Sequence, residues 1–86
     1  MNDRIKTVTP RVVRMHPADN VAIVVNDGGL IVGTVLDKGV VLRDKVPQGH
    51  KVALSELVTG QAVIRYNVPV GYARQNIPAG SWVHER

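Results

Sequence analysis

The chain has 86 residues, and 11 Lys and Arg residues against 7 Asp and Glu residues give it a formal net charge of +4. It has no cysteine and its 3 histidines are dispersed, so neither a disulfide framework nor a structural zinc site can stabilise the fold. A nucleic-acid-binding surface is disfavoured, because only 4 of the basic residues gather in the first 14 positions, the others alternate with acidic residues, and only two tyrosines and one tryptophan are present for stacking.

Aliphatic side chains dominate the sequence and must supply the core. Seventeen valines, 5 isoleucines and no phenylalanine favour strands, because branching at Cβ restricts χ1. We therefore expect one mainly β domain over residues 10–86, preceded by a flexible lead-in over Met1–Thr9. Val12–Met15 is predicted as a short first strand. Val21–Val25 is apolar at every position, which predicts a strand buried on both faces or at the centre of a sheet.

A meander of short connections is expected to follow. Asn26–Gly29 has the residues of a hairpin turn, and Leu30–Leu36 is expected to return as the paired strand. Asp37–Gly39 then turns the chain into Val40–Arg43. The one candidate for a helical turn is Ala53–Leu57, which is short enough to be a single 3₁₀ turn.

A repeated unit organises the second half of the chain: an apolar residue, two spacers, a glycine, two more spacers and a valine. Its three copies are Val46–Val52, Leu57–Val63 and Ile77–Val83. Each copy predicts a strand end, a tight turn whose glycine takes a positive φ, and a new strand with a buried valine. Two copies place proline after the apolar residue, where its fixed φ suits the first position of an ordered turn.

Four segments resemble, in the same order, segments of the small amino-terminal SAF domain of the altronate and galactarate dehydratases. Their sequences are more similar to the galactarate type than to the altronate type. They are His16-Pro-Ala-Asp19-Asn20-Val-Ala, Pro47-Gln-Gly-His50-Lys51-Val-Ala-Leu, Ile64-Arg-Tyr66-Asn-Val-Pro-Val-Gly71-Tyr-Ala and Ile77-Pro-Ala-Gly80-Ser-Trp-Val-His84. The similarity runs from about His16 to the end, and four motifs in register make it specific.

The resemblance implies a β-clip fold, in which two-stranded ribbons fold over one another. In the dehydratases this domain precedes a much larger catalytic domain, which becomes the expected partner, whereas related sulfolactate lyases keep the small piece as a separate subunit. The chain is therefore expected to be an excised domain, with a free small subunit or a non-catalytic module for anionic sugars or a partner protein as alternatives. Self-association through exposed ribbon edges is a further possibility.

The implied chemistry is removal of water from a sugar diacid. A base takes the proton α to a carboxylate and the β-hydroxyl leaves, helped by a divalent metal, with iron as the expected ion, in the full-length enzyme. No cofactor and no activity are expected of this domain alone. The chain shows neither a signal peptide nor an apolar run that approaches the thickness of a bilayer, so a cytoplasmic location without membrane or nucleic-acid partners is expected.

His50 and Lys51 are the first candidate site residues, because they follow Gly49 at a corner from which loop side chains project. His50 could transfer a proton or ligate a metal, and Lys51 could hold a substrate carboxylate. The alternative is that His50 only caps a turn and Lys51 is a solvated strand residue. The residues by themselves favour this alternative, and the resemblance brings the two interpretations level.

His16 is the second candidate catalytic residue, since Asp19 three positions later could orient its ring through an N–H group. The alternative, preferred from the spacing, is an Asx-type turn in which Asp19 or Asn20 bonds nearby main chain. The two interpretations are compatible.

Arg65 is the second candidate for binding a substrate carboxylate, because a guanidinium can donate two parallel hydrogen bonds. Its alternative is an exposed ion pair with Asp44 or Glu56. Tyr66 and Trp82 are expected to fill volume in the core or at an edge.

His84 matches one histidine of a terminal histidine-rich motif in altronate-type members. Trp82 and Arg86 stand where that motif has further histidines. Because a metal site needs several ligands, no metal ligand is assigned.

Overall fold

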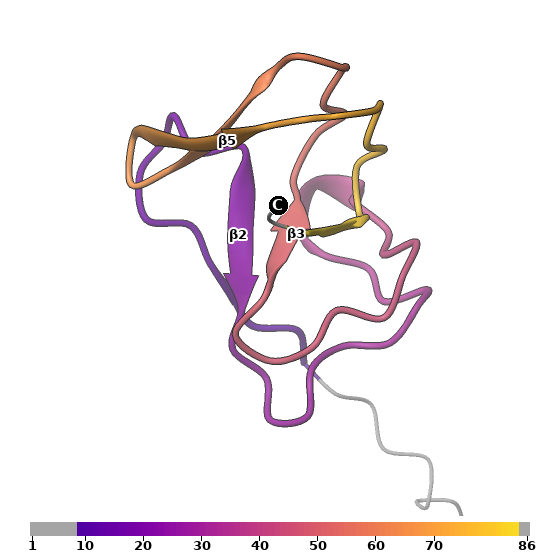
Figure 1. The fold of residues 1–86 in the computed structure, drawn as a ribbon. Coiled ribbons are helices and arrows are strands. Elements are labelled where there is room, and N and C mark those ends of the chain that lie inside the picture. The colour runs from indigo at the N-terminus through magenta and orange to yellow at the C-terminus, as the bar shows by residue number, and fades with distance from the viewer. Residues whose placement is uncertain (1–8, 85–86) are drawn as a thin grey trace, which may run out of the picture.

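The fold is built from two antiparallel sheets, seen in a computed structural model that describes residues 9–84 (Figure 1). The larger sheet has the strand order β1-β2-β3-β6, and the smaller one pairs β4 with β5. The bounds are β1 Val12–Val13, β2 Val21–Val24, β3 Lys51–Ala53, β4 Ala62–Arg65, β5 Val68–Tyr72 and β6 Trp82–Val83. Over these residues the predicted mainly β class is confirmed, and the single 3₁₀ turn is η1, Asp37–Gly39.

Strands β2 and β3 form the centre of the molecule and are buried on both faces. Ala22 pairs with Val52, and both side chains enter one apolar cluster; the neighbouring pair, Val21 and Ala53, enters a second cluster on the other side. Successive residues of a strand point to opposite faces, so two small cores result. The predicted burial is confirmed for Val21, Ala22 and Val24, whereas Ile23 is half-buried and Val25 lies beyond the strand and is exposed.

The glycine corners predicted from the repeat are confirmed. Gly49, Gly60 and Gly80 have φ values of +84°, +88° and +88°. In each corner the residue after the glycine donates its N–H to the carbonyl three positions earlier, as His50 does to Pro47 at 3.1 Å. This is the pattern of a turn that requires positive φ at its third position.

Gly33 forms a fourth corner of the same kind, which the sequence analysis missed. Its φ is +90°, and Thr34 donates to the carbonyl of Ile31 at 3.2 Å. Leu30–Leu36 has the same spacing of apolar residue and glycine as the other copies, so the prediction of one continuous strand over it is wrong. Within this segment only Leu30 and Val35 form isolated bridges, to Val46 and Val41.

Main-chain hydrogen bonds connect the four corner segments in two pairs. Leu30 and Val46 exchange both main-chain hydrogen bonds at 2.9 Å, and Leu57 and Ile77 do the same at 2.8 and 2.7 Å. The first hairpin of the predicted meander over residues 21–43 is therefore wrong, because β2 pairs with β1 and β3 rather than with Leu30–Leu36. The predicted turn at Asp37–Gly39 is confirmed, since Val35 and Val41 form an antiparallel bridge across it.

Gly29 explains this departure from the expected hairpin. A Cβ there would lie 2.4 Å from the carbonyl oxygen of Val46, so the lack of a side chain allows the chain to cross closely against Val46.

The predicted helical turn at Ala53–Leu57 is also wrong. Ala53 ends β3, Leu54 donates its N–H to the carbonyl of Asn20 at 2.9 Å, and Leu57 pairs with Ile77. Tertiary hydrogen bonds thus hold this segment in a bend between β3 and Leu57 instead of a helical turn. The 3₁₀ turn lies instead at η1, where Lys38 and Gly39 have φ values of 64° and 80°.

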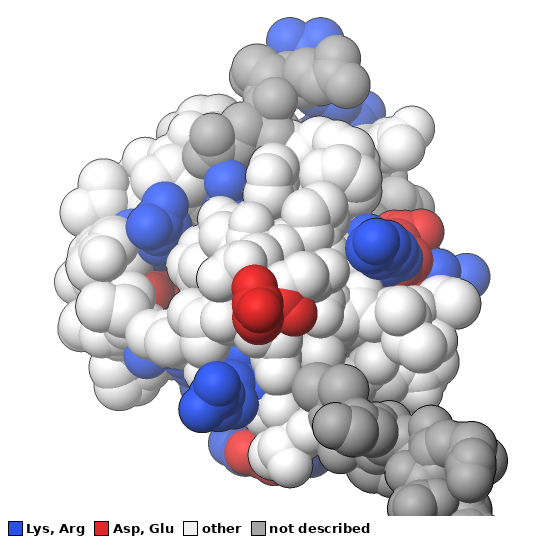
Figure 2. All heavy atoms as spheres, turned by 90° about the horizontal axis from the view of Figure 1, so that it is seen from below, with Lys and Arg blue, Asp and Glu red and all other residues white. Residues whose placement is uncertain are grey.

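The described surface carries dispersed charge. On the face shown in Figure 2, basic and acidic side chains are scattered among uncharged residues, and no large field of one sign forms. Across residues 9–84 there is no helix long and apolar enough to span a bilayer. The expected lead-in falls, apart from Thr9, outside the described residues, and the division into lead-in and domain and the cytoplasmic location stay predictions.

Candidate functional site

His50 lies exposed at the Gly49 corner and meets the indole of Trp82. The Nε1–H of Trp82 donates to Nδ1 of His50 at 3.3 Å, and the two rings are nearly perpendicular, at 86° with centroids 5.2 Å apart. His84 lies over the indole, with a centroid separation of 4.0 Å and an angle of 34°. We call His50, Trp82 and His84 the ring cluster.

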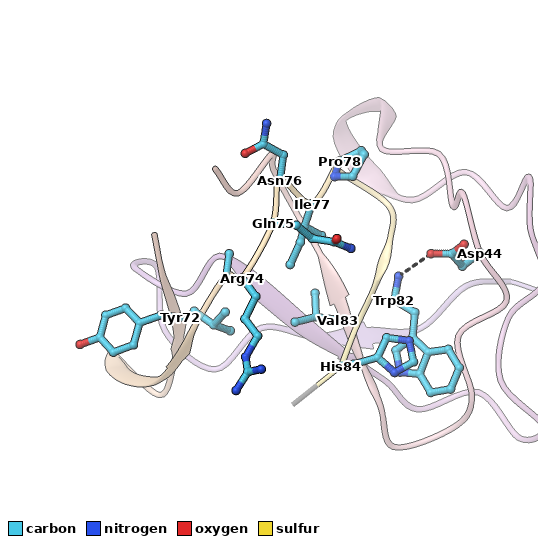
Figure 3. Close-up of a pocket in the computed structure, with 12 residues that line it drawn as sticks. Asp44, Tyr72, Arg74, Gln75, Asn76, Ile77, Pro78, Trp82, Val83 and His84 are labelled. Carbon is cyan, nitrogen blue, oxygen red and sulfur yellow. Dashed lines mark hydrogen bonds between the residues drawn. The ribbon is translucent and has the colours of Figure 1, made fainter. Parts of the chain in front are cut away.

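The register of β3 and β6 brings the ring cluster together. Lys51 pairs with Val83 and Val52 with Trp82, so the next antiparallel position places His50 opposite His84. Trp82 and His84 are two residues apart and therefore share a face. Asp44 fixes the cluster further by accepting the main-chain N–H of Trp82 at 3.0 Å (Figure 3).

A surface hollow of about 480 Å³ adjoins the ring cluster (Figure 3). The segment Tyr72–Pro78 forms one side of it, and Trp82, Val83 and His84 form another. Arg74 is exposed at this hollow, whereas Val63 and Val83 contribute buried apolar surface. The hollow therefore combines apolar surface with a permanently cationic group and with the carboxylate of Asp44, which accepts the N–H of Trp82. The Arg74 side of the hollow suits an anionic ligand of modest size.

Lys51 occupies a different environment from that of its neighbour His50. It is only 8% exposed, so the interpretation of Lys51 as a solvated strand residue is wrong. It lines a smaller hollow of about 30 Å³ that shares Val63, Tyr72, Val83 and His84 with the larger one. His84 thus stands between the two hollows that contain Lys51 and Arg74.

Asp19 has a structural position that the sequence analysis only partly foresaw. It is 2% exposed, and its carboxylate accepts main-chain N–H groups from His16 at 3.1 Å, Tyr66 at 3.0 Å and Asn67 at 2.8 Å. Tyr66 and Asn67 connect β4 to β5 with φ values of 58° and 61°, which non-glycine residues seldom adopt. Asp19 therefore holds together a tight hairpin turn that is far away in the sequence.

The pKa of Asp19 reflects this environment. Burial would raise the pKa of the carboxyl, but main-chain hydrogen bonds outweigh burial and hold the pKa below its ordinary value of 3.8. The donors are the N–H groups of Asn67, Tyr66, His16 and Met15.

Asn20 extends the same attachment to β4. Its side chain accepts from the N–H of Ile64 at 2.8 Å and donates to the carbonyl of Ala62 at 3.0 Å. The pair Asp19 and Asn20 thus binds the β4–β5 ribbon to the larger sheet. Asp19 thus bonds main chain rather than the ring of His16, but its local bond is to the N–H of His16 three residues earlier, which is not the bond of an Asx turn.

His16 is exposed, and its ring Nδ1 accepts the N–H of Ala18 at 3.0 Å. Asp19 contacts the main chain of His16, so the ring is oriented by its own turn rather than by the carboxylate.

Arg65 is half-buried on β4. Its guanidinium carbon lies 5.1 Å from the centroid of the Tyr66 ring, so within the described residues it meets an aromatic ring rather than the carboxylate of Asp44 or Glu56. Its Nε is buried without a hydrogen-bond partner. Arg65 does not line either of the two hollows beside the ring cluster.

Comparison with known proteins identifies the family of the chain. A sequence profile of the altronate/galactarate dehydratase SAF domain matches residues 10–86. The chain belongs to this family. Its SAF domain is 46% identical over 82 residues to galactarate dehydratase (L-threo-forming) of Escherichia coli (strain K12), a match that covers 95% of the chain and 16% of that enzyme.

Two further relatives extend the comparison. The SAF domain is 43% identical over 75 residues to altronate dehydratase of the same organism, covering 84% of the chain and 15% of the enzyme. It is 35% identical over 79 residues to (2R)-sulfolactate sulfo-lyase subunit alpha of Chromohalobacter salexigens, covering 81% of the chain and 84% of that subunit. The chain thus spans roughly a sixth of the dehydratases and most of the lyase subunit.

The predicted site residues of this SAF domain do not form one site. The main-chain carbonyl of His50 accepts from Val24, at the end of β2, whereas His16 belongs to the turn that precedes β2. The length of β2 separates the two histidines. Sequence reasoning missed the ring cluster and Arg74, although the two-residue spacing of Trp82 and His84 was a usable signal for a shared face.

The described part of the SAF domain does not fit a metal ion by itself. Among residues 9–84 there is no group of three His, Asp or Glu side chains that could hold one. The ring cluster offers two imidazoles, and the Nδ1 of His50 is engaged by Trp82. No metal-bound step is therefore assigned to these residues.

Proposed function

We propose that this SAF domain forms one wall of the active site of a sugar-diacid dehydratase of the galactarate type and assists the removal of water from a hexarate. The observation that carries the proposal is the 46% identity to galactarate dehydratase across 95% of the chain. The ring cluster and the adjoining hollow support it, because they present a histidine and the guanidinium of Arg74 at the surface.

The hollow beside the ring cluster suits a carboxylate. The guanidinium of Arg74 can donate two parallel hydrogen bonds to one carboxylate, and Lys51 borders the adjoining smaller hollow. A diacid carries two such groups, so one of them can bind on this wall while the other faces a partner domain. Arg65 and His16 stay predicted site residues, and they lie outside these hollows.

The proposed reaction is an elimination in the complete protein. A base removes the proton on the carbon α to a carboxylate, the electrons of that C–H bond form the C=C bond, and the β C–O bond breaks. The departing hydroxide and the removed proton together make one molecule of water. Hydrogen-bond donors and cations stabilise the negative charge that develops on the substrate carboxylate, which is the part we give to His50, Lys51 and Arg74.

The remaining parts of the reaction require groups from beyond residues 9–84. We propose a larger catalytic domain as the partner, with a divalent metal, iron being the expected ion, held by ligands of that domain. We accordingly expect the 86-residue chain alone to be inactive toward galactarate. Formation of a keto acid by the purified chain would contradict this expectation.

The test uses the complete product of the gene that encodes this chain, assayed with galactarate and altronate. His50→Ala should lower kcat by about 100-fold, the usual effect of removing one preorganised donor. The matched control is Gln61→Ala, since Gln61 is exposed and follows Gly60 as His50 follows Gly49. A wild-type rate in His50→Ala would overturn the proposed site, and failure to dehydrate any hexarate would overturn the proposed function.

A second candidate function is that of a small lyase subunit of the sulfolactate type. The match that covers 84% of (2R)-sulfolactate sulfo-lyase subunit alpha supports it. The assay for this candidate is release of sulfite from sulfolactate by the complete gene product with its co-purified partners. Sulfite release without hexarate dehydration would favour the lyase subunit, and the reverse would favour the dehydratase domain.

A further inference from the structure

The hydrogen bond between Trp82 and His50 determines which ring nitrogen of His50 carries the proton, in addition to the position of the ring. The indole Nε1–H can only donate, and it lies 3.3 Å from Nδ1 of His50. That nitrogen must therefore provide a lone pair. In neutral His50 the proton then sits on the other ring nitrogen, Nε2.

The indole that makes this bond is held from several sides. Its main-chain N–H is bonded to Asp44 at 3.0 Å, its ring is covered by His84, and Trp82 is paired with Val52 in the sheet. His50 is exposed and stands at a corner, so its outer nitrogen is accessible to a ligand. A fixed donor in Trp82 thus faces the acceptor Nδ1 of His50, and the Nε2–H on the other side of the ring is accessible to a ligand.

We propose that Trp82 is a positioning residue that keeps His50 in its Nε2–H form, so that His50 donates a hydrogen bond to an oxygen anion of an acidic substrate rather than removing a proton from it. A base needs a free lone pair, and the only one of the ring is directed to Trp82. If Nδ1 of His50 carried a proton, its N–H would point at the Nε1–H of Trp82, and the hydrogen bond between the two rings would be lost. This inference rests on the proposed function, because it names the part that His50 plays there.

The tautomer is measured on the 86-residue chain labelled with ¹⁵N, by long-range ¹H–¹⁵N correlation spectra of the histidine rings above their titration range. Wild-type His50 should show a protonated Nε2 and an unprotonated Nδ1. Trp82→Phe keeps an aromatic ring but removes the N–H, so the two tautomers of His50 should then mix. His16, whose Nδ1 is bonded by Ala18, is the internal control and should not change. A proton on Nδ1 of wild-type His50, or spectra of His50 unaltered by Trp82→Phe, would overturn the inference.

The chemical role is measured on the complete gene product. The amide N–H of glutamine reaches about as far as Nε2 of histidine but cannot act as a base. His50→Gln should therefore keep kcat within about tenfold of wild type, whereas His50→Ala should lose about 100-fold. Equal loss in both variants would overturn the inference and leave the proposed function standing. A wild-type rate in both would remove the proposed site itself, whatever the spectra show.

Discussion

Two polar clusters lie at opposite ends of β2, and they use similar residue types for different purposes. At the start of β2, Asp19 is buried and its oxygens are occupied by main-chain donors of the β4–β5 turn. At the other end, His50 is exposed and bonds a side chain of β6. The first cluster connects parts of the fold, whereas the second leaves ring nitrogen and surface accessible to a ligand.

The difference lies in what each polar group contacts rather than in sequence spacing. His16 and Asp19 have the spacing of a carboxylate that orients an imidazole, yet Asp19 bonds main chain. His50 and Trp82 are 32 positions apart, and they make the ring contact that the closer pair lacks. The spacing of a histidine and an acid in the sequence therefore does not show whether the acid orients the imidazole or bonds main chain.

The largest expected effect is on stability, and it tests the Gly80 corner, which precedes Trp82 and β6. A Cβ at Gly80 would lie 2.0 Å from the carbonyl oxygen of Val41, whereas a Cβ at Gly60, with the same φ of +88°, would meet open space. Gly60→Ala should cost about 1–2 kcal/mol from its φ alone, and Gly80→Ala about 4 kcal/mol or more because backbone must move. Gly80→Val should be worse still. Thermal and urea unfolding measure the difference, and equal Tm values for the two alanine variants would contradict the close packing at Gly80.

The next effect tests whether the Asp19 cluster is structural. Asp19→Ala leaves main-chain N–H groups of a strained turn unpaired, so at pH 7 its Tm should fall by more than about 5 °C. The pKa of Asp19 is lowered in the fold, so the carboxylate stabilises the protein above pH 3.8 and this contribution is lost as the pH falls through the folded-state pKa.

The Tm difference between wild type and Asp19→Asn should therefore narrow as the pH is lowered below 3.8. The control is Asp27→Asn, which removes an exposed carboxylate in a turn. A constant difference down to pH 2 would show that the charge of Asp19 does not matter.

The smallest expected effect concerns the ring cluster. His50 is exposed, so His50→Ala should change the free energy of unfolding by no more than about 0.5 kcal/mol. Urea unfolding followed by far-UV circular dichroism measures it without relying on the indole that the mutation disturbs. A loss as large as that of Asp19→Ala would mean that both clusters are structural, and would return His50 to the role of a turn cap.

Much of the fold could be predicted because local residue types determine it. The Gly49, Gly60 and Gly80 corners follow from glycine at positions that need positive φ, and the β2 strand from its unbroken apolar run. The prediction of which segments pair with one another was wrong. Nothing local indicates that Leu30 bonds Val46, and the approach of Gly29 to Val46 is a tertiary contact. Ala53–Leu57 failed for the same reason, since hydrogen bonds to distant segments outweigh its helix propensity.

The site was predictable to a smaller extent. The exposure of His50 follows from its place after a corner glycine, and the resemblance drew attention to it. The burial of Lys51 requires knowing that β3 is covered on both faces, and the contact of Arg65 with Tyr66 depends on the local hairpin. Arg74 carries no local signal, because it borders a hollow that exists only once Tyr72–Pro78 has packed beside β6.

The position of Trp82 on β6 also bears on how folding can be followed. It is the only tryptophan of the 86-residue sequence, and it lies on β6, which follows the other five strands in the described residues. Its indole reaches the edge of the His50 ring only after β6 has docked on β3. Quenching of its fluorescence by the neighbouring imidazoles would therefore report the docking of β6 on β3, and would allow refolding to be followed without any added dye.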